Sequence, residues 1–132
     1  MCSSDLDDSF NCITVDGDTS TNDTVLCLAN GLAGNTTIQQ GTAHYRRFQK
    51  MLTEACQTLA LAICRDGEGV TKVVKIVVAG AKTAAAARHV AQTVATSNLV
   101  KTALFGEDAN WGRVMGAIGR SGVPIDPNKV AL

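Results

Sequence analysis

The densest cluster of polar side chains in the sequence is Asp16–Thr24, which reads DGDTSTNDT. It holds three carboxylates, four hydroxyls and one amide, and it lies between two apolar segments. Such a segment can line a polar pocket, or it can form hydrogen bonds within its own turn, as these residue types commonly do. A calcium loop of the EF-hand kind is excluded, because the required glycine and glutamate are missing from its sixth and twelfth positions.

A glutamate between two glycines is the second candidate. The segment Arg65–Gly69 reads RDGEG and follows a long amphipathic pattern, so we expect Glu68 in the turn that ends a helix. Flanking glycines let the backbone approach a ligand closely, and the carboxylate could bind an ammonium group. From the residues alone, an exposed acidic side chain in a loop is the simpler interpretation.

The third candidate surrounds the single tryptophan, in the segment FGEDANWGR. Arg113 could pair with a carboxylate or stack on an aromatic ring. In the alternative interpretation, Asp108 or Asn110 caps a helix, and Trp111 packs into the core. Both interpretations use the same residue types, so the sequence leaves them open.

Several classes of site find no support in the residue pattern. The glycines at residues 112–122 lack the Gly-Lys-Ser/Thr of a phosphate loop, so close helix packing explains them better. His44 and His89 have no metal-binding spacing, and the five cysteines include no Cys-x-x-Cys pair. We therefore expect no metal site, and a reducing compartment.

Charge and hydropathy narrow the function classes further. Twelve basic and twelve acidic residues cancel, which argues against a nucleic-acid-binding surface. No apolar stretch approaches the roughly 20 residues of a membrane span. Residues 1–8 carry three acidic side chains and no apolar run, unlike a signal peptide. We expect a cytoplasmic protein that binds neither nucleic acid nor a membrane.

Extended segments and helices alternate along the chain. Apolar or β-branched runs at residues 12–15, 25–29 and 70–80 predict strands. A helical repeat predicts a long amphipathic helix over residues 43–65. The shorter elements expected are a helix over residues 83–97, a strand or helix over 99–106, a helix over 110–118 and a turn over 123–128.

This alternation is typical of a layered α/β domain. The strand at residues 12–15 has almost no sequence before it, and the sequence stops just after the turn at residues 123–128. Because a strand without neighbours leaves a sheet edge unpaired, we expect the domain to be incomplete at both ends.

Three blocks resemble those of one enzyme family. SFNCITVDGDTSTNDTVLCLANG, at residues 9–31, is similar to a signature of the ornithine acetyltransferase family, also called glutamate N-acetyltransferase or the arginine biosynthesis bifunctional protein. RDGEGVTK at residues 65–72 and LVKTALFGEDANWGRVMGAIGRSG at residues 99–122 resemble two further blocks, in the family's order. Residues 9–132 thus resemble a partial β-chain domain, whereas residues 1–8 look like a non-family end.

The resemblance implies a layered α/β sandwich of the ornithine acetyltransferase or DmpA-like type. It also implies a precursor that cuts itself into an α chain and a β chain, so that a threonine becomes the N-terminal nucleophile. This threonine takes the acetyl group from N2-acetyl-L-ornithine and passes it to L-glutamate, with its own amine as the base. The block around this threonine is absent from the sequence, so we expect no catalytic residue here and no activity from this chain alone.

Partners and cofactors follow from the same resemblance. The expected partner is the α chain of the same precursor, in an α2β2 heterotetramer. No cofactor is expected, although some family members also take acetyl-coenzyme A as acetyl donor.

The resemblance assigns one substrate-binding residue, Glu68, which would pair with the amino group of the amino-acid substrate. The remaining candidates are expected to shape the pocket or support it; they are Asp16, Asn22, Asp23, Asn110 and Arg113. Two alternatives stay open. One is an N-terminal-nucleophile aminopeptidase of similar architecture, and the other is a non-catalytic module that binds small anions through the glycines at residues 112–122.

Overall fold

The computed structural model describes residues 6–132, and these residues form two compact units. Unit 1 contains the described residues up to Ile13 together with Asp18–Asp66. Unit 2 contains Thr14–Gly17 and Gly67–Leu132. None of the helices in the described part of the chain is long and apolar enough to cross a membrane.

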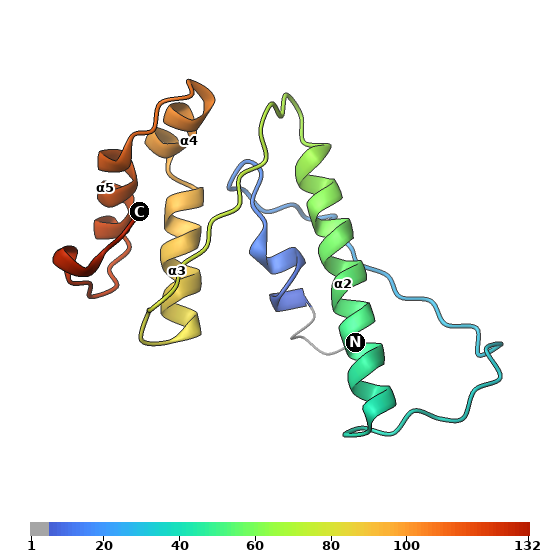
Figure 1. The fold of residues 1–132 in the computed structure, drawn as a ribbon. Coiled ribbons are helices and arrows are strands. Elements are labelled where there is room, and N and C mark those ends of the chain that lie inside the picture. Colours follow the sequence, from blue (N-terminus) through green and yellow to red (C-terminus); the bar gives the residue numbers. More distant parts are fainter. Residues whose placement is uncertain (1–5) are drawn as a thin grey trace. The chain divides into compact units, whose positions relative to one another are not determined.

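Unit 1 is built around helix α2, Ala43–Arg65 (Figure 1). The predicted bounds of this helix are confirmed. Thr42 caps its N-terminus, because the Thr42 hydroxyl accepts a hydrogen bond from the backbone N–H of Tyr45 at 3.2 Å. The buried side chains of the helix are Cys56 and Ala60. Most of its remaining apolar residues are exposed, such as Phe48 at 53 %.

A short 3-10 helix, η1, Phe10–Cys12, packs against α2. The side-chain amide of Gln57 donates a hydrogen bond to the backbone carbonyl of Asp8 at 3.1 Å. This contact ties the start of the described chain to the middle of the long helix.

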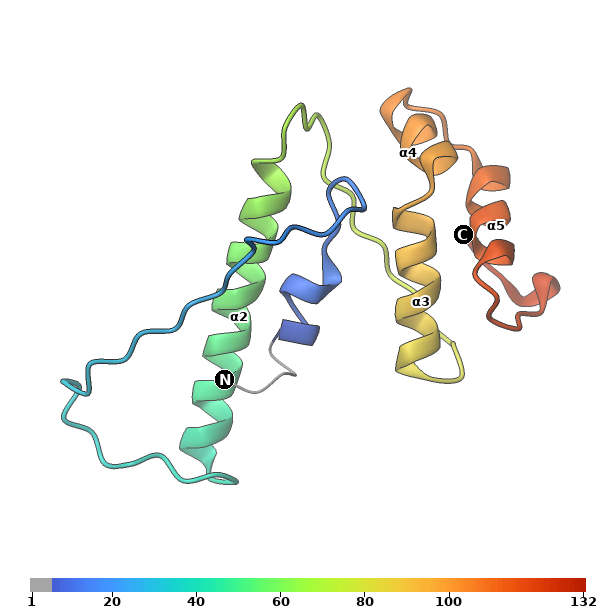
Figure 2. The ribbon, with the colours of Figure 1, turned by 180° about the vertical axis from the view of Figure 1, so that it is seen from behind.

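Unit 2 is a group of three helices, in which α3 packs against α4 and α5, and α4 packs against α5 (Figures 1 and 2). Its core combines Val90 and Val94 of α3, Val100 of α4, and Ala117 and Ile118 of α5. The helices are α3, Ala84–Ala95, α4, Asn98–Phe105, and α5, Trp111–Arg120, followed by the 3-10 helix η2, Pro127–Lys129.

Side-chain caps decide where these three helices begin. Thr83 caps α3 as predicted, with its hydroxyl accepting from the backbone N–H of Ala86 at 3.1 Å. Ser97 caps α4, so the segment over residues 99–106, for which the sequence allowed a strand or a helix, is a helix. Asn110 caps α5. A hydroxyl or amide oxygen in this position satisfies a backbone N–H that has no partner within the helix.

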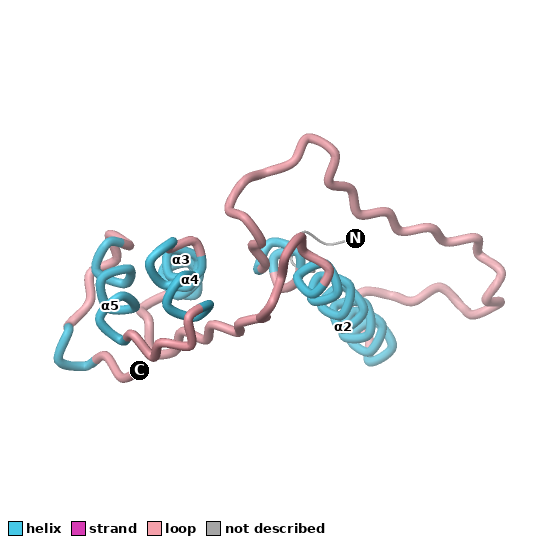
Figure 3. Tube along the Cα trace, turned by 90° about the horizontal axis from the view of Figure 1, so that it is seen from above, coloured by secondary structure: helices cyan, strands magenta, loops and turns pink. Residues whose placement is uncertain are grey.

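The predicted strands are not confirmed in the described residues, which form helices and loops only (Figure 3). A strand needs a neighbouring strand to complete its backbone hydrogen bonds. Residues 12–15, 25–29 and 70–80 have no such neighbour within residues 6–132. Many of their apolar side chains are accordingly exposed, such as Leu28 at 92 % and Val77 at 73 %, whereas Ile76 and Val78 pack partly on the core of unit 2.

For α5, the interpretation that packed Trp111 into the core, one of the two that the sequence left open, is not supported, and the prediction of close packing at the glycines is wrong. Trp111 is 72 % exposed, because it is the first residue of the helix and the core contacts begin only with Val114. The glycines do not mark close packing either, since a side chain added at Gly116 or Gly119 would meet no atom within 4 Å. Gly122 differs, because its φ of +73° favours glycine just after the helix ends.

Candidate functional site

Glu68 lies in a tight turn at the start of unit 2. The backbone N–H of Val70 donates to the carbonyl of Gly67 at 3.1 Å, which closes a four-residue turn. Gly69 has a φ of +69°, as the third position of a type II turn requires. The turn leaves Glu68 exposed, and its carboxylate forms no hydrogen bond or ion pair with the other residues of the described chain. It is therefore available to an external cation.

Lys72, shortly after this turn, is attached to the end of α4. Its Nζ donates to the backbone carbonyls of Leu104 and Phe105, both at 3.0 Å, and forms an ion pair with Glu107 Oε1 at 3.2 Å. A lysine ammonium has three donors, so these three oxygens account for all of them. A cation is also favourable at the C-terminus of a helix, where the macrodipole places partial negative charge.

The end of α4 has the geometry of a Schellman motif. The backbone N–H of Asp108 donates to the carbonyl of Ala103 at 2.9 Å, and that of Glu107 donates to Leu104 at 3.2 Å. Glu107 occupies the left-handed position of this motif, with a φ of 57°. Glycine is the usual residue there, so the chain accepts some backbone strain to keep a carboxylate beside Lys72.

Asn110 and Arg113 hold the start of α5 against α4. The side-chain oxygen of Asn110 accepts from the backbone N–H of Arg113 at 3.1 Å, and its amide donates to Asp108 Oδ2 at 2.9 Å. Arg113 Nη1 donates to the carbonyl of Leu99 at 3.0 Å and to Thr102 Oγ1 at 3.1 Å. These contacts place both residues within one helix-to-helix junction of unit 2.

The polar segment around Asn22 forms local hydrogen bonds. The backbone N–H of Asn22 donates to Ser20 Oγ at 3.1 Å, and Thr21 Oγ1 donates to Asn22 Oδ1 at 3.1 Å. Thr24 Oγ1 donates to the Asn22 carbonyl, also at 3.1 Å. The neighbouring Asp23 is exposed. This part of the segment behaves as a turn that satisfies its own polar groups.

Asp16 belongs to unit 2, whereas Asn22 and Asp23 belong to unit 1. Beside it, the carbonyl of Val15 accepts a hydrogen bond from Lys101 Nζ at 3.2 Å, which joins this segment to α4. Asp16 therefore belongs to a different unit from Asn22 and Asp23, although the three residues are close in the sequence.

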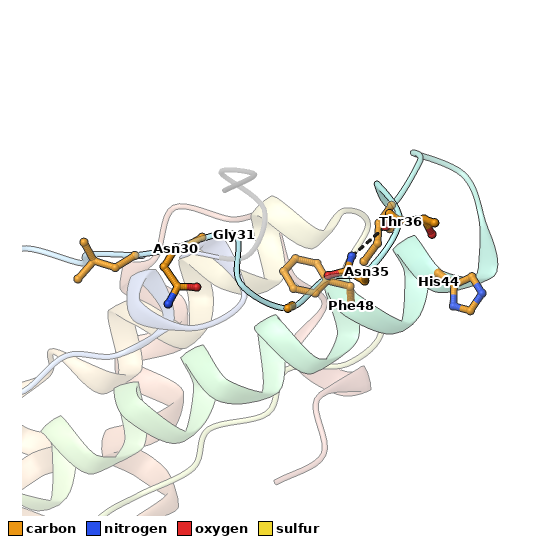
Figure 4. Close-up of a pocket in the computed structure, with 10 residues that line it drawn as sticks. Asn30, Gly31, Asn35, Thr36, His44 and Phe48 are labelled. Carbon is orange, nitrogen blue, oxygen red and sulfur yellow. Dashed lines mark hydrogen bonds between the residues drawn. The ribbon is translucent and has the colours of Figure 1, made fainter.

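Unit 1 has an open hollow of about 850 Å³ between a loop and the first turns of α2 (Figure 4). His44 and Phe48 of the helix line one part of it, and Asn35 donates a hydrogen bond to the carbonyl of Thr36 at 2.8 Å on the loop side. The hollow contains none of the site residues expected from the sequence. The lining residues are Leu28, Ala29, Asn30, Gly31, Ala33, Asn35, Thr36, Ile38, His44 and Phe48.

Metal-binding and thiol groups are scattered. Within residues 6–132, no three His, Cys, Asp or Glu side chains lie together in a way that could hold a metal ion. Cys12 and Cys27 are exposed and Cys56 is buried. Burial raises the pKa of the Cys64 thiol, because desolvation disfavours its thiolate.

A model of the ArgJ family matches residues 1–132 of the chain. The chain belongs to the ArgJ family. One relative, the arginine biosynthesis bifunctional protein ArgJ of Symbiobacterium thermophilum, is 60 % identical over 126 residues, which are 96 % of this chain and 31 % of the relative. The mitochondrial ArgJ protein of Yarrowia lipolytica is 53 % identical over 126 residues, or 96 % of this chain and 29 % of the relative. The resemblance inferred from the three sequence blocks is confirmed.

The chain spans about a third of the length of these curated ArgJ relatives. The crystal structure of ArgJ from Bacillus halodurans is similar to the present structure, with a TM-score of 0.89 and 48 % identity. That similarity covers 94 % of this chain and 58 % of the other. The arrangement described for each unit is therefore part of a fold that occurs in a solved ArgJ protein.

One residue at this site was missed by the sequence reasoning, namely Lys72. A signal was available, because Lys72 interrupts the apolar run of residues 70–78. Its partners lie 32 and 33 residues away in the sequence, so no local pattern could identify them.

Proposed function

We propose that this ArgJ-family chain is an internal part of the β chain of an acetyltransferase that moves the acetyl group from N2-acetyl-L-ornithine to L-glutamate. The observation that carries the proposal is the family match over all 132 residues. The exposed Glu68 carboxylate supports it, because an amino-acid substrate brings an ammonium group that needs an anion. A charge-assisted contact of this kind contributes roughly 1.5–3 kcal/mol.

The chemistry proposed for the complete enzyme has two halves. The hydroxyl of an N-terminal threonine attacks the acetyl carbonyl, the bond to the ornithine nitrogen breaks, and that nitrogen takes up the proton. The glutamate amine then attacks the acetyl-threonine ester, which frees the hydroxyl and gives N-acetylglutamate. The nucleophile, and the α chain that would complete the site, belong to parts of the precursor other than this sequence.

The remaining features of the proposal concern assembly. We place the chain in an α2β2 heterotetramer in the cytoplasm, with acetyl-coenzyme A as an alternative acetyl donor. The three extended segments become strands of a layered α/β sandwich when the rest of the protein supplies neighbouring strands. The exposed apolar side chains at Leu28 and Val77 support this, since such side chains favour burial.

The test is a transfer assay on the complete protein that contains this segment. N-acetylornithine with a deuterated acetyl group is incubated with glutamate, and the products are identified by mass spectrometry. We expect labelled N-acetylglutamate. Release of labelled acetate at the same rate with and without glutamate would instead indicate a hydrolase, and no reaction at all would contradict both.

A further inference from the structure

We propose that Lys72 is a positioning residue for Glu68, because it fixes the end of the Glu68 turn to the C-terminus of α4. The inference rests on the proposed role of Glu68 in substrate binding. It concerns residues of unit 2 only.

The first argument is the completeness of the attachment. The two carbonyls that Lys72 contacts belong to the last two residues of α4, and the Phe105 carbonyl lies beyond the bonds of the Schellman motif. The Leu104 carbonyl also accepts the Glu107 N–H bond of that motif, whereas the Phe105 carbonyl is one of those that a helix end leaves without a partner inside the helix. Lys72 donates to both carbonyls and uses its third donor on Glu107. Its ammonium group is thus bound to two backbone oxygens at the end of α4 and to one carboxylate oxygen.

The second argument comes from Glu107. A glycine would adopt its φ of 57° without strain, and 81 % of the Glu107 side chain is exposed, so core packing does not explain a glutamate here. The contact that the side chain makes is the ion pair with Lys72. Glu107 therefore adds a second point of attachment to the same lysine.

The third argument is distance along the chain. Only Thr71 separates Lys72 from Val70, the last residue of the turn, so the Cα atoms of Glu68 and Lys72 are at most about 13 Å apart. Further along, Ile76 and Val78 pack on the helix core of unit 2. In an extended segment these two residues share a face with Lys72. The segment is therefore attached at a polar point near the turn and an apolar point beyond it.

Within residues 6–132 this segment has no strand partner, and the contacts of Lys72, Ile76 and Val78 hold it on α4 and on the helix core of unit 2. A slip by one residue would turn the face that carries Ile76 and Val78 away from the core. Without Lys72, the nearest attachment after the turn would be the apolar packing of Ile76 and Val78. We expect the Glu68 carboxylate then to move away from the substrate's amino group.

The experiment is a double-mutant cycle in the complete enzyme, with KM and kcat for glutamate as readouts. Lys72→Met removes all three donors but keeps a long apolar side chain. We expect it to raise KM about threefold to tenfold, with kcat within about twofold, because a misplaced carboxylate still attracts the ammonium group. Lys75→Met is the matched control, because Lys75 is exposed on the opposite face, and it should leave KM unchanged.

The decisive comparison is Lys72→Met in the Glu68→Gln background. If Lys72 acts through Glu68, the Lys72→Met substitution raises KM in the wild type and does not raise it further in the Glu68→Gln background. An equal rise in both backgrounds, or no rise in either, would overturn the inference. If Glu68→Gln itself left KM unchanged, the proposed substrate contact would be wrong, and the positioning role with it. Failure of the proposed Glu68 contact can thus be told apart from failure of the Lys72 inference alone, because the Glu68→Gln variant by itself reveals it.

A second variant keeps the test available if Lys72→Met enzyme is not soluble. Glu107→Ala removes one attachment point from an exposed position. It should raise KM about twofold in the wild type and not at all with Glu68→Gln. If the Lys72→Met enzyme is not soluble, an unchanged KM in the Glu107→Ala enzyme would overturn the inference.

Discussion

The core of unit 2 gives a quantitative test of the structure, because two adjacent residues of α4 differ sharply in burial. Val100 is 3 % exposed and belongs to the core cluster, whereas Leu99 is 62 % exposed. Each can be replaced by alanine, which is compatible with a helix. The same chemical change is therefore made on the inner and the outer face of one helix.

The expected loss follows from the atoms removed. Val100→Ala deletes two buried carbons, worth about 1.6 kcal/mol at roughly 0.8 kcal/mol each. The space left behind adds a smaller term, so the free energy of unfolding should fall by about 2 kcal/mol. Leu99→Ala deletes three carbons that are mostly in water already, and should cost below about 1 kcal/mol. The carbonyl of Leu99 that binds Arg113 is unaffected by this change.

The assay is urea unfolding of the chain followed by far-ultraviolet circular dichroism, with the same slope required for all three proteins. The structure predicts a clearly lower midpoint for Val100→Ala and a nearly unchanged one for Leu99→Ala. Equal losses from both substitutions would mean that α4 does not bury this face, and the arrangement of unit 2 would be wrong.

Three further outcomes are expected. Asn110→Ala should lower the free energy of unfolding by about 1 kcal/mol because it removes the cap of α5, while Asn128→Ala, in an exposed turn, should change it little; urea unfolding measures both. As pH rises, the Cys64 thiol should be alkylated later than that of exposed Cys27, because its raised pKa lowers the thiolate fraction. Buried Cys56 should react last. Mass spectrometry of the alkylated peptides measures the order, and equal rates for the three thiols in the folded protein would contradict it. The purified 132-residue chain should form no N-acetylglutamate, and measured turnover would refute the proposal that the nucleophile lies elsewhere.

The helices were predictable because their signals are local. The apolar repeat of residues 43–65 and the cap at Thr42 lie within or beside the helix itself. The cap of α5 was among the alternatives for the same reason, since Asn110 bonds to a backbone N–H three residues away. The exposure of Trp111 was not predictable, because it depends on where α5 meets the other helices of unit 2.

The strands and the anchor at Lys72 depend on partners that the local sequence does not contain. A β-branched run such as residues 70–80 is extended in the structure, but pairing requires another strand. The turn around Glu68 could be inferred from its glycines, and Gly69 does adopt the left-handed conformation. The contacts that hold this turn come from α4, which only the folded structure brings next to Lys72.

The most direct test of the proposed function is the effect of Glu68→Gln on KM in the complete enzyme. Glu54→Gln is the matched control, because Glu54 is an exposed glutamate of α2 whose carboxylate forms an ion pair with Lys50 at 3.8 Å. Loss of a charge-assisted contact worth roughly 1.5–3 kcal/mol predicts a rise in the KM for glutamate of about 10- to 150-fold. Self-cleavage of the precursor should continue, and Glu54→Gln should leave KM unchanged. Loss of self-cleavage, or an unchanged KM in the cleaved enzyme, would contradict the account, because Glu68 would then serve maturation or structure and not substrate binding.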